Sequence, residues 1–167
     1  VKKANTEMLF YVYGAVLFLC LLTFRSIPGV ICAVLPLMMT SILCEALMVW
    51  LGIGVKVATL PVIALGVGIG VDYALYVLTV ILAKLRQGLN LTEAYYETLN
   101  FTGRVVALIG VTLAAGVVTW SMSPIKFQAD MGILLTFMFL WNMFGALILM
   151  PALATFLLKP HKQESAA

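Results

Sequence analysis

The chain has 167 residues, of which 63% are hydrophobic and only 10% are charged, and its mean hydropathy is +1.12. Soluble domains are about half apolar and about a quarter charged, so this composition excludes a soluble globular domain and indicates an integral membrane protein. The net charge of +3 is small, and the basic residues lie near the ends of apolar stretches. That distribution is typical of orientation in a membrane rather than of nucleic-acid binding.

The pattern of apolar segments predicts an all-α bundle of five transmembrane helices, since about 20 apolar residues cross a bilayer. The five segments lie at about 8–24, 30–51, 60–82, 104–122 and 131–158. A polar lead-in at 1–7 precedes the first span, and Pro28 and Gly29 are expected to form the turn that follows it. Pro151 is expected to kink the fifth span near its end, ahead of a polar tail at 159–167.

The polar connection between the third and fourth spans is predicted to contain a short helix at about 91–99. Asn90 is a favourable N-cap residue, and Glu93 follows three residues later. The apolar face of this helix would be formed by Leu91, Tyr95 and Leu99. An amphipathic helix of this kind lies at the membrane interface. It either anchors the connection or couples the motions of the two spans that it joins.

The basic residues predict the orientation of the spans. One side of the membrane would hold Arg25, Lys84, Arg86, Arg104, Lys159 and Lys162. The other side would hold Lys56 and Lys126, together with Lys2 and Lys3. Because cytoplasmic loops carry the excess of Lys and Arg, we expect a cytoplasmic C-terminus and an N-terminus on the outer side.

The cysteines and the absence of catalytic motifs argue against an enzyme. Cys20, Cys32 and Cys44 lie in apolar stretches, and neither their odd number nor their spacing fits a disulfide framework or a zinc site. We interpret them as small buried hydrophobic residues. The sequence contains no nucleotide-binding loop, nucleophile motif or metal-ligand cluster. We therefore expect no cofactor and no metal.

The most informative residue is Asp72, which lies in the middle of the third apolar span. A charged side chain at the bilayer centre costs about 3 kcal/mol or more, and such residues usually serve a function. The basic residues of the chain lie at segment ends, so none is expected to pair with Asp72, and desolvation favours the neutral acid. We expect Asp72 to gain and lose a proton; the alternative is a structural acid held by a partner.

Four further polar residues are candidates for support of such a site. Tyr73 lies about 100° further round the helix than Asp72, so we expect its hydroxyl to face another helix and to meet a second acid that this chain does not supply. Glu45, in the second span, either reaches the outer surface, bonds to a hydroxyl of its own helix or joins a polar path. Thr112 is expected to reach Asp72, and Asn142 is expected to form an interhelical hydrogen bond.

Small residues line two sides of the third span. Gly66, Gly70 and Ala74 are spaced four apart and form a ridge against which another helix can pack closely. Gly68 and Asp72 form a neighbouring row, also four apart, so the backbone beside the acid carries no side chain. We expect another element to pack or move tightly against it.

These motifs resemble a known family. The run GVGIGVDYALY at 66–76 resembles the fourth and tenth transmembrane helices of the RND superfamily, especially its MmpL-like and hydrophobe/amphiphile exporter branches. The connection at 88–104 and the run LMPAL at 149–153 resemble the segments that follow in that family. The resemblance covers about 8–158 and implies the C-terminal transmembrane half, helices eight to twelve.

The resemblance implies a proton-motive-force-driven exporter of lipids or other hydrophobic or amphiphilic compounds. In that family, Asp-Tyr pairs from two pseudo-symmetric halves face each other at mid-membrane and relay protons, and Asp72 and Tyr73 match one such pair. The implied partners are membrane lipid, the first transmembrane half with the extracytoplasmic porter domains, and further copies of the protein. The implied location is the bacterial inner membrane, with no nucleic-acid partner.

Two other functions remain open from the sequence. Sterol-sensing domains have a similar five-helix unit, so a lipid-binding module without transport is one alternative, in which Asp72 would be structural. An RND-type auxiliary subunit of protein translocation is the other. A matching Asp-Tyr helix in the first half would favour transport, and its absence would favour sensing.

Overall fold

The computed structural model describes residues 2–25, 27–54 and 60–157. Its elements are α1 (Lys2–Phe24), α2 (Ile27–Trp50), α3 (Leu60–Arg86), α4 (Leu91–Thr98), the π-helix η2 (Leu99–Gly103), α5 (Arg104–Val118), the 3₁₀-helix η3 (Thr119–Met122), α6 (Lys126–Phe144), the π-helix η4 (Gly145–Leu149) and α7 (Met150–Leu157). Five helices are long and apolar enough to cross a membrane, and the described residues form no strand. The prediction of an all-α bundle of five membrane-length helices is confirmed.

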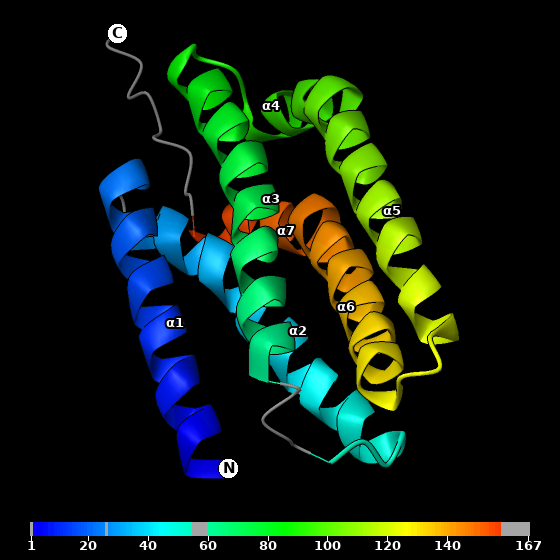
Figure 1. Ribbon diagram of the computed structural model, residues 1–167. Helices are drawn as coiled ribbons and strands as arrows, with labels where there is room; N and C mark the ends of the chain where they lie inside the picture. Colours follow the sequence, from blue (N-terminus) through cyan, green and yellow to red (C-terminus); the bar gives the residue numbers. More distant parts are fainter. Residues whose placement is uncertain (1, 26, 55–59, 158–167) are drawn as a thin grey trace, which may run out of the picture.

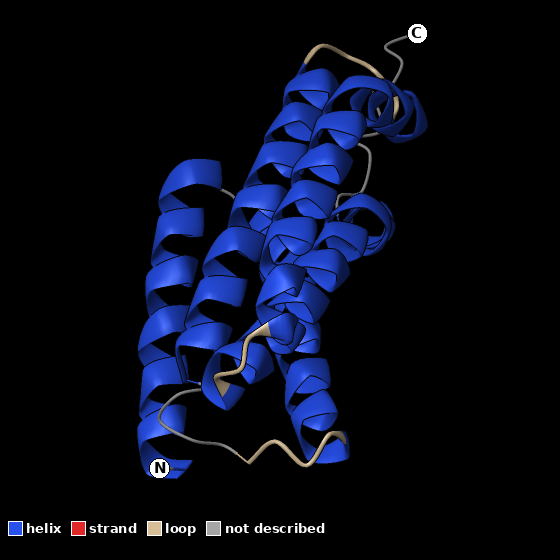
Figure 2. Ribbon diagram, turned by 45° about the vertical axis from the view of Figure 1, so that its right-hand side comes forward, coloured by secondary structure: helices blue, strands red, loops and turns tan. Residues whose placement is uncertain are grey.

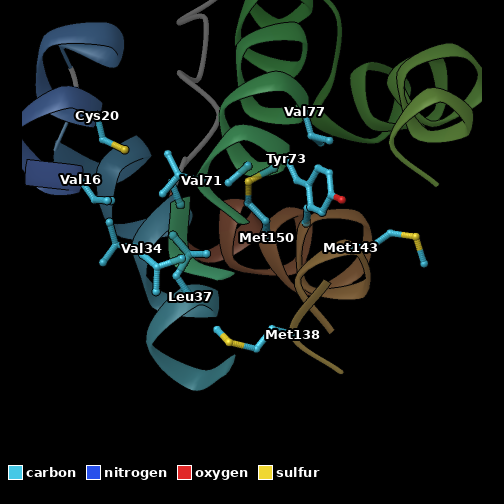
Figure 3. Packing of buried hydrophobic residues seen from close by; sticks show 14 of the residues in the cluster. Val16, Cys20, Val34, Leu37, Val71, Tyr73, Val77, Met138, Met143 and Met150 are labelled. Carbon is cyan, nitrogen blue, oxygen red and sulfur yellow. The ribbon is translucent and has the colours of Figure 1, made fainter. Parts of the chain in front are cut away.

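Helix α3 is central to the bundle (Figure 1). It packs against α1, α2 and α6, and α5 packs chiefly against α6. Figure 2 shows the bundle from a second side, with the N-terminus at one end and the loop between α3 and α4 at the other. The buried side chains of α1, α2, α3 and α6 form one apolar cluster, which includes Val16, Leu37, Val71 and Met138 (Figure 3).

The connection between the first two helices is shorter than predicted. Helix α1 already includes the polar residues from Lys2 onward, and α2 begins at Ile27. Pro28 and Gly29 therefore lie inside the first turn of α2 rather than in a turn. Proline is tolerated there because the first amide groups of a helix have no partner in the preceding turn.

Two glycines end helices in the left-handed region that favours this residue. Gly52 has φ of 67° after α2, and Gly88 has φ of 91° after α3. Beyond Gly52, the amide of Ile53 donates to the carbonyl of Met48 at 2.9 Å. These turns reverse the chain at opposite ends of the bundle (Figure 1).

The last membrane helix bends at the π-helical turn η4, just before Pro151 (Figure 1). Pro151 has no amide hydrogen, so the carbonyl four residues earlier, that of Leu147, lacks its usual donor. The Tyr95 hydroxyl of α4 donates to this carbonyl at 2.8 Å. The proline thus leaves an acceptor open, and α4 supplies the missing donor.

Helix α4 is held against the bundle by more than this bond. Ala94 is fully buried, and Lys84 of α3 forms an ion pair with Glu97 at 2.7 Å. Both partners of the pair are partly exposed, so the pair contributes little. The predicted apolar face is rotated, because Ala94 and Thr98 are buried and Leu99 is 38% exposed. These contacts join α4 to α3 and to the last membrane helix.

The remaining sequence predictions concern the cysteines and the ends of the helices. All three cysteines are free and buried, as predicted. The ends of α1 and α3 and the start of α5 lie at one end of the bundle, and the start of α6 lies at the other (Figure 1). This arrangement separates Arg25, Lys84, Arg86 and Arg104 from Lys126. Lys56, Lys159, Lys162 and the tail at 159–167 lie outside the described residues.

Replacing Tyr95 by phenylalanine should destabilise the protein by about 1 kcal/mol, because the Leu147 carbonyl would lose its donor in an apolar environment. The midpoint of thermal unfolding of the complete protein in detergent measures the effect. Tyr96→Phe is the matched control, since Tyr96 is 68% exposed. Equal midpoints for the two variants would contradict the role given to the Tyr95 bond.

Candidate functional site

Helix α3 has a packed side and an open side. Its buried residues are Val62, Ile63, Gly66, Val67, Gly70, Val71, Tyr73, Ala74, Val77, Leu78 and Ile81. The exposed residues form a stripe along the helix, with Leu65, Gly68, Asp72, Tyr76 and Thr79 at intervals of three or four. A stripe of this width lies on one face, so no described helix covers this side of α3.

Asp72 lies at the middle of the open stripe. Its surroundings form a shallow hollow on α3, lined by Asp72, Leu75, Tyr76, Thr79 and Val80. Across the described ranges, no hydrogen bond or ion pair involves Asp72. The carboxyl group therefore points away from the five-helix unit, toward whatever covers the stripe.

Tyr73 points the other way. It is 4% exposed and belongs to the buried cluster of Figure 3. Its hydroxyl oxygen is buried without a hydrogen-bond partner in the structure described. The Tyr73 hydroxyl therefore does not face an acid from outside this chain, contrary to the expectation from the sequence. Because successive residues are about 100° apart around a helix, Tyr73 lies inside the bundle whereas Asp72 lies on the open side.

Thr112 does not reach Asp72, so that expectation is wrong. Its hydroxyl donates to the carbonyl of Leu108 in its own helix at 2.7 Å, on an exposed face. The reason is the packing order: α5 lies against α6 (Figure 1). A threonine without an interhelical partner commonly bonds to the preceding turn of its own helix.

Asn142 forms the interhelical bond that the sequence predicted. Its side-chain nitrogen, on α6, donates to the backbone carbonyl of Gly66 on α3 at 2.7 Å. The side chain is 4% exposed, and its other polar atom, Oδ1, has no partner among the described residues. The bond ties α6 to α3 about one and a half turns from Asp72.

The glycines of α3 differ in what surrounds them. A Cβ atom at Gly66 would come closer than 3.0 Å to Met138, and one at Gly70 would come that close to Leu37 and Asn142. A Cβ atom at Gly68 would have nothing within 4 Å, and Ala74 is 4% exposed. Gly66, Gly70 and Ala74 thus lie on the packed side, whereas Gly68 accompanies Asp72 on the open side.

Glu45 belongs to a different location, between α1 and α2. It is half-buried and lines a small hollow with Tyr13 and Ser41. The hydroxyls on its own helix have other partners: Ser41 pairs with Tyr13 at 2.5 Å, and Thr40 donates to the Pro36 carbonyl at 2.9 Å. No pattern in the sequence predicts the Tyr13–Ser41 pair, whose members lie 28 residues apart.

Among the described residues, no cluster of three or more His, Cys, Asp or Glu side chains could hold a metal ion. The chemistry available on the open side of α3 is that of a single carboxyl group, with the hydroxyls of Tyr76 and Thr79 in the same hollow. Such a group can exchange a proton, accept hydrogen bonds or pair with a cation.

The five membrane-length helices identify a module of a multi-pass membrane protein. The sequence matches the family model named MMPL family over residues 5–163. The chain therefore belongs to the MMPL family.

A membrane protein of Streptomyces coelicolor, designated SCO6666, is 34% identical to this chain over 91 residues. The aligned part is 54% of this chain and 13% of that protein. The chain thus spans a small fraction of the length of the curated relative that it matches.

Replacing Gly70 by alanine should destabilise the protein by about 1–3 kcal/mol, because the added methyl group displaces Leu37 and Asn142 and strains the bond to Gly66. Thermal unfolding of the complete protein measures the loss. Gly116→Ala is the control, since a Cβ atom there meets nothing within 4 Å. An equal loss in both variants would mean that the cost arises from the chemistry of the substitution and not from the contact of α3 with α6.

Proposed function

We propose that this chain is the membrane half of a proton-motive-force-driven RND exporter of lipids or other hydrophobic or amphiphilic compounds, and that Asp72 carries the proton. The observation that supports this most directly is the placement of Asp72. It lies mid-helix on the open stripe of α3 and forms no bond within the five-helix unit described. An acid in that position acts on something outside this unit.

Protonation of Asp72 is the proposed switch. The neutral carboxylic acid packs against an apolar neighbour at modest cost, whereas the carboxylate requires a hydrogen-bond donor, a cation or water. The protonation state of Asp72 therefore changes the free energy of covering the open stripe. In the proposed cycle, the covering surface is the matching helix of the first transmembrane half, and two packings alternate with the proton.

Tyr73 is the second member of the proposed relay. Its hydroxyl is buried without a partner in the structure described, so a small rotation or shift of α3 that offers it one would be favourable. Such a movement would displace the side chains of Met138, Leu37 and Asn142, which fill the space beside Gly66 and Gly70. Asn142 then acts as the polar tie that limits the movement.

The substrate class and the location rest on membership of the family and on the distribution of charge. We infer the bacterial inner membrane, with the end of the bundle that carries Arg25, Lys84, Arg86 and Arg104 in the cytoplasm. The porter domains of the complete protein would meet the substrate, assembled with further copies of the protein.

Replacing Asp72 by asparagine should abolish export by the complete protein while leaving its folding intact, because asparagine keeps the shape and some hydrogen bonding but binds no proton. Substrate transport into or out of proteoliposomes under an imposed proton gradient measures the effect, and thermal unfolding checks the fold. Glu93→Gln, at an exposed position of α4, is the control for loss of a carboxylate.

The result also separates transport from sensing. Infrared titration of the carboxyl band that disappears in Asp72→Asn should show a group that responds to pH and to substrate. Export at the normal rate by Asp72→Asn would rule out Asp72 as the proton carrier. A sensing module would instead give two results. The unmodified protein would show no proton-coupled transport, and the Asp72→Asn variant would lose lipid binding.

A further inference from the structure

The hollow between α1 and α2 is separate from the stripe that carries Asp72. It has a volume of about 160 Å³ and is lined by Leu9, Tyr13, Met38, Ser41, Ile42 and Glu45. Its polar groups come from one turn of α2 and the facing turn of α1, and its other walls are apolar. A space of this size is similar to the roughly 150 Å³ engineered cavity that holds benzene, so it admits a head group but not a whole lipid.

The hydrogen bonds in this hollow leave Glu45 without a donor. The Tyr13 hydroxyl donates to the Leu37 carbonyl at 3.1 Å, and the Tyr13 and Ser41 hydroxyls share a hydrogen bond at 2.5 Å. Neither of these bonds involves Glu45. Glu45 forms no hydrogen bond or ion pair with any described residue.

Glu45 also ends an apolar stripe on the outer face of α2. The residues that lead to it are Ile31, Leu35, Met38 and Ile42, which are 41%, 43%, 49% and 65% exposed. Their intervals of three and four residues place them on one line. From residue 31 to residue 45 the stripe is about 21 Å long, which suits an extended alkyl chain with its polar end at the carboxylate.

We propose that this surface binds an amphiphile with an ammonium head group. The Glu45 carboxylate accepts hydrogen bonds from the ammonium group, the second lone pair of the Tyr13 oxygen offers another acceptor, and the alkyl chain lies along the stripe from Ile42 to Ile31. The carboxylate selects against anionic head groups. The proposal is independent of Asp72, since neither residue lines the other's hollow.

The test uses the complete protein in phosphatidylcholine nanodiscs and a photoactivatable alkyl amine, with the labelled peptides identified by mass spectrometry. Peptides from α1 and α2 should be labelled, and unlabelled dodecylamine should compete where dodecanol and dodecanoate do not. Adding phosphatidylethanolamine to the nanodiscs shows whether the occupant is a membrane lipid or a free alkyl amine. Reduced labelling identifies the lipid, and unchanged labelling identifies the free amine.

Glu45→Gln should weaken binding of the alkyl amine by at least about tenfold, the value of one charged hydrogen bond. Glu93→Gln should leave the affinity unchanged. Ile42→Trp, which fills the hollow and keeps the carboxylate, should also reduce labelling and decides the case if Glu45→Gln fails to fold. Equal labelling of the Glu45→Gln variant, or equal competition by dodecanol or dodecanoate, would overturn the proposal.

Discussion

The close approach of α3 to α6 is the constraint on which the rest of the structure depends. Gly66 and Gly70 leave no room for a side chain, because Met138 and Asn142 of α6 occupy that space. The same approach brings the Asn142 amide within hydrogen-bond distance of a backbone carbonyl in α3. Once this side of the helix is fixed against its neighbours, the opposite side is determined, and Asp72 lies on it.

The orientation of α3 explains why adjacent residues have different environments. A helix turns by about 100° per residue, so a helix packed on one side and open on the other separates Asp72 from Tyr73. The acid is left to an outside partner, whereas the phenol is enclosed with a hydroxyl that lacks a partner in the described structure. No hydrogen bond joins these two side chains among the described residues.

Features that depend on local sequence could be predicted, and features that depend on which helices meet could not. The lengths of the apolar segments predicted the five helices. The position of the Asn142 side-chain amide within a span predicted its hydrogen bond to another helix. The sequence did not show that α5 lies against α6, so Thr112 was assigned to the wrong neighbour. Pro151 correctly predicted a bend near the end of the last span, but the Tyr95–Leu147 bond at that bend joins residues 52 apart and could not be predicted.

Asp72 and Glu45 carry the same functional group, but their surroundings and hydrogen-bond partners give them different chemistry. Asp72 lies at mid-helix on the open side of α3, and in the proposed function its charge state controls how that side is covered. Glu45 lies near the end of α2, beside two hydroxyls that bond to each other, and at the end of an apolar stripe. A carboxylate in that setting lacks a donor and adjoins a surface suited to an alkyl chain, which makes an ammonium amphiphile the complementary ligand.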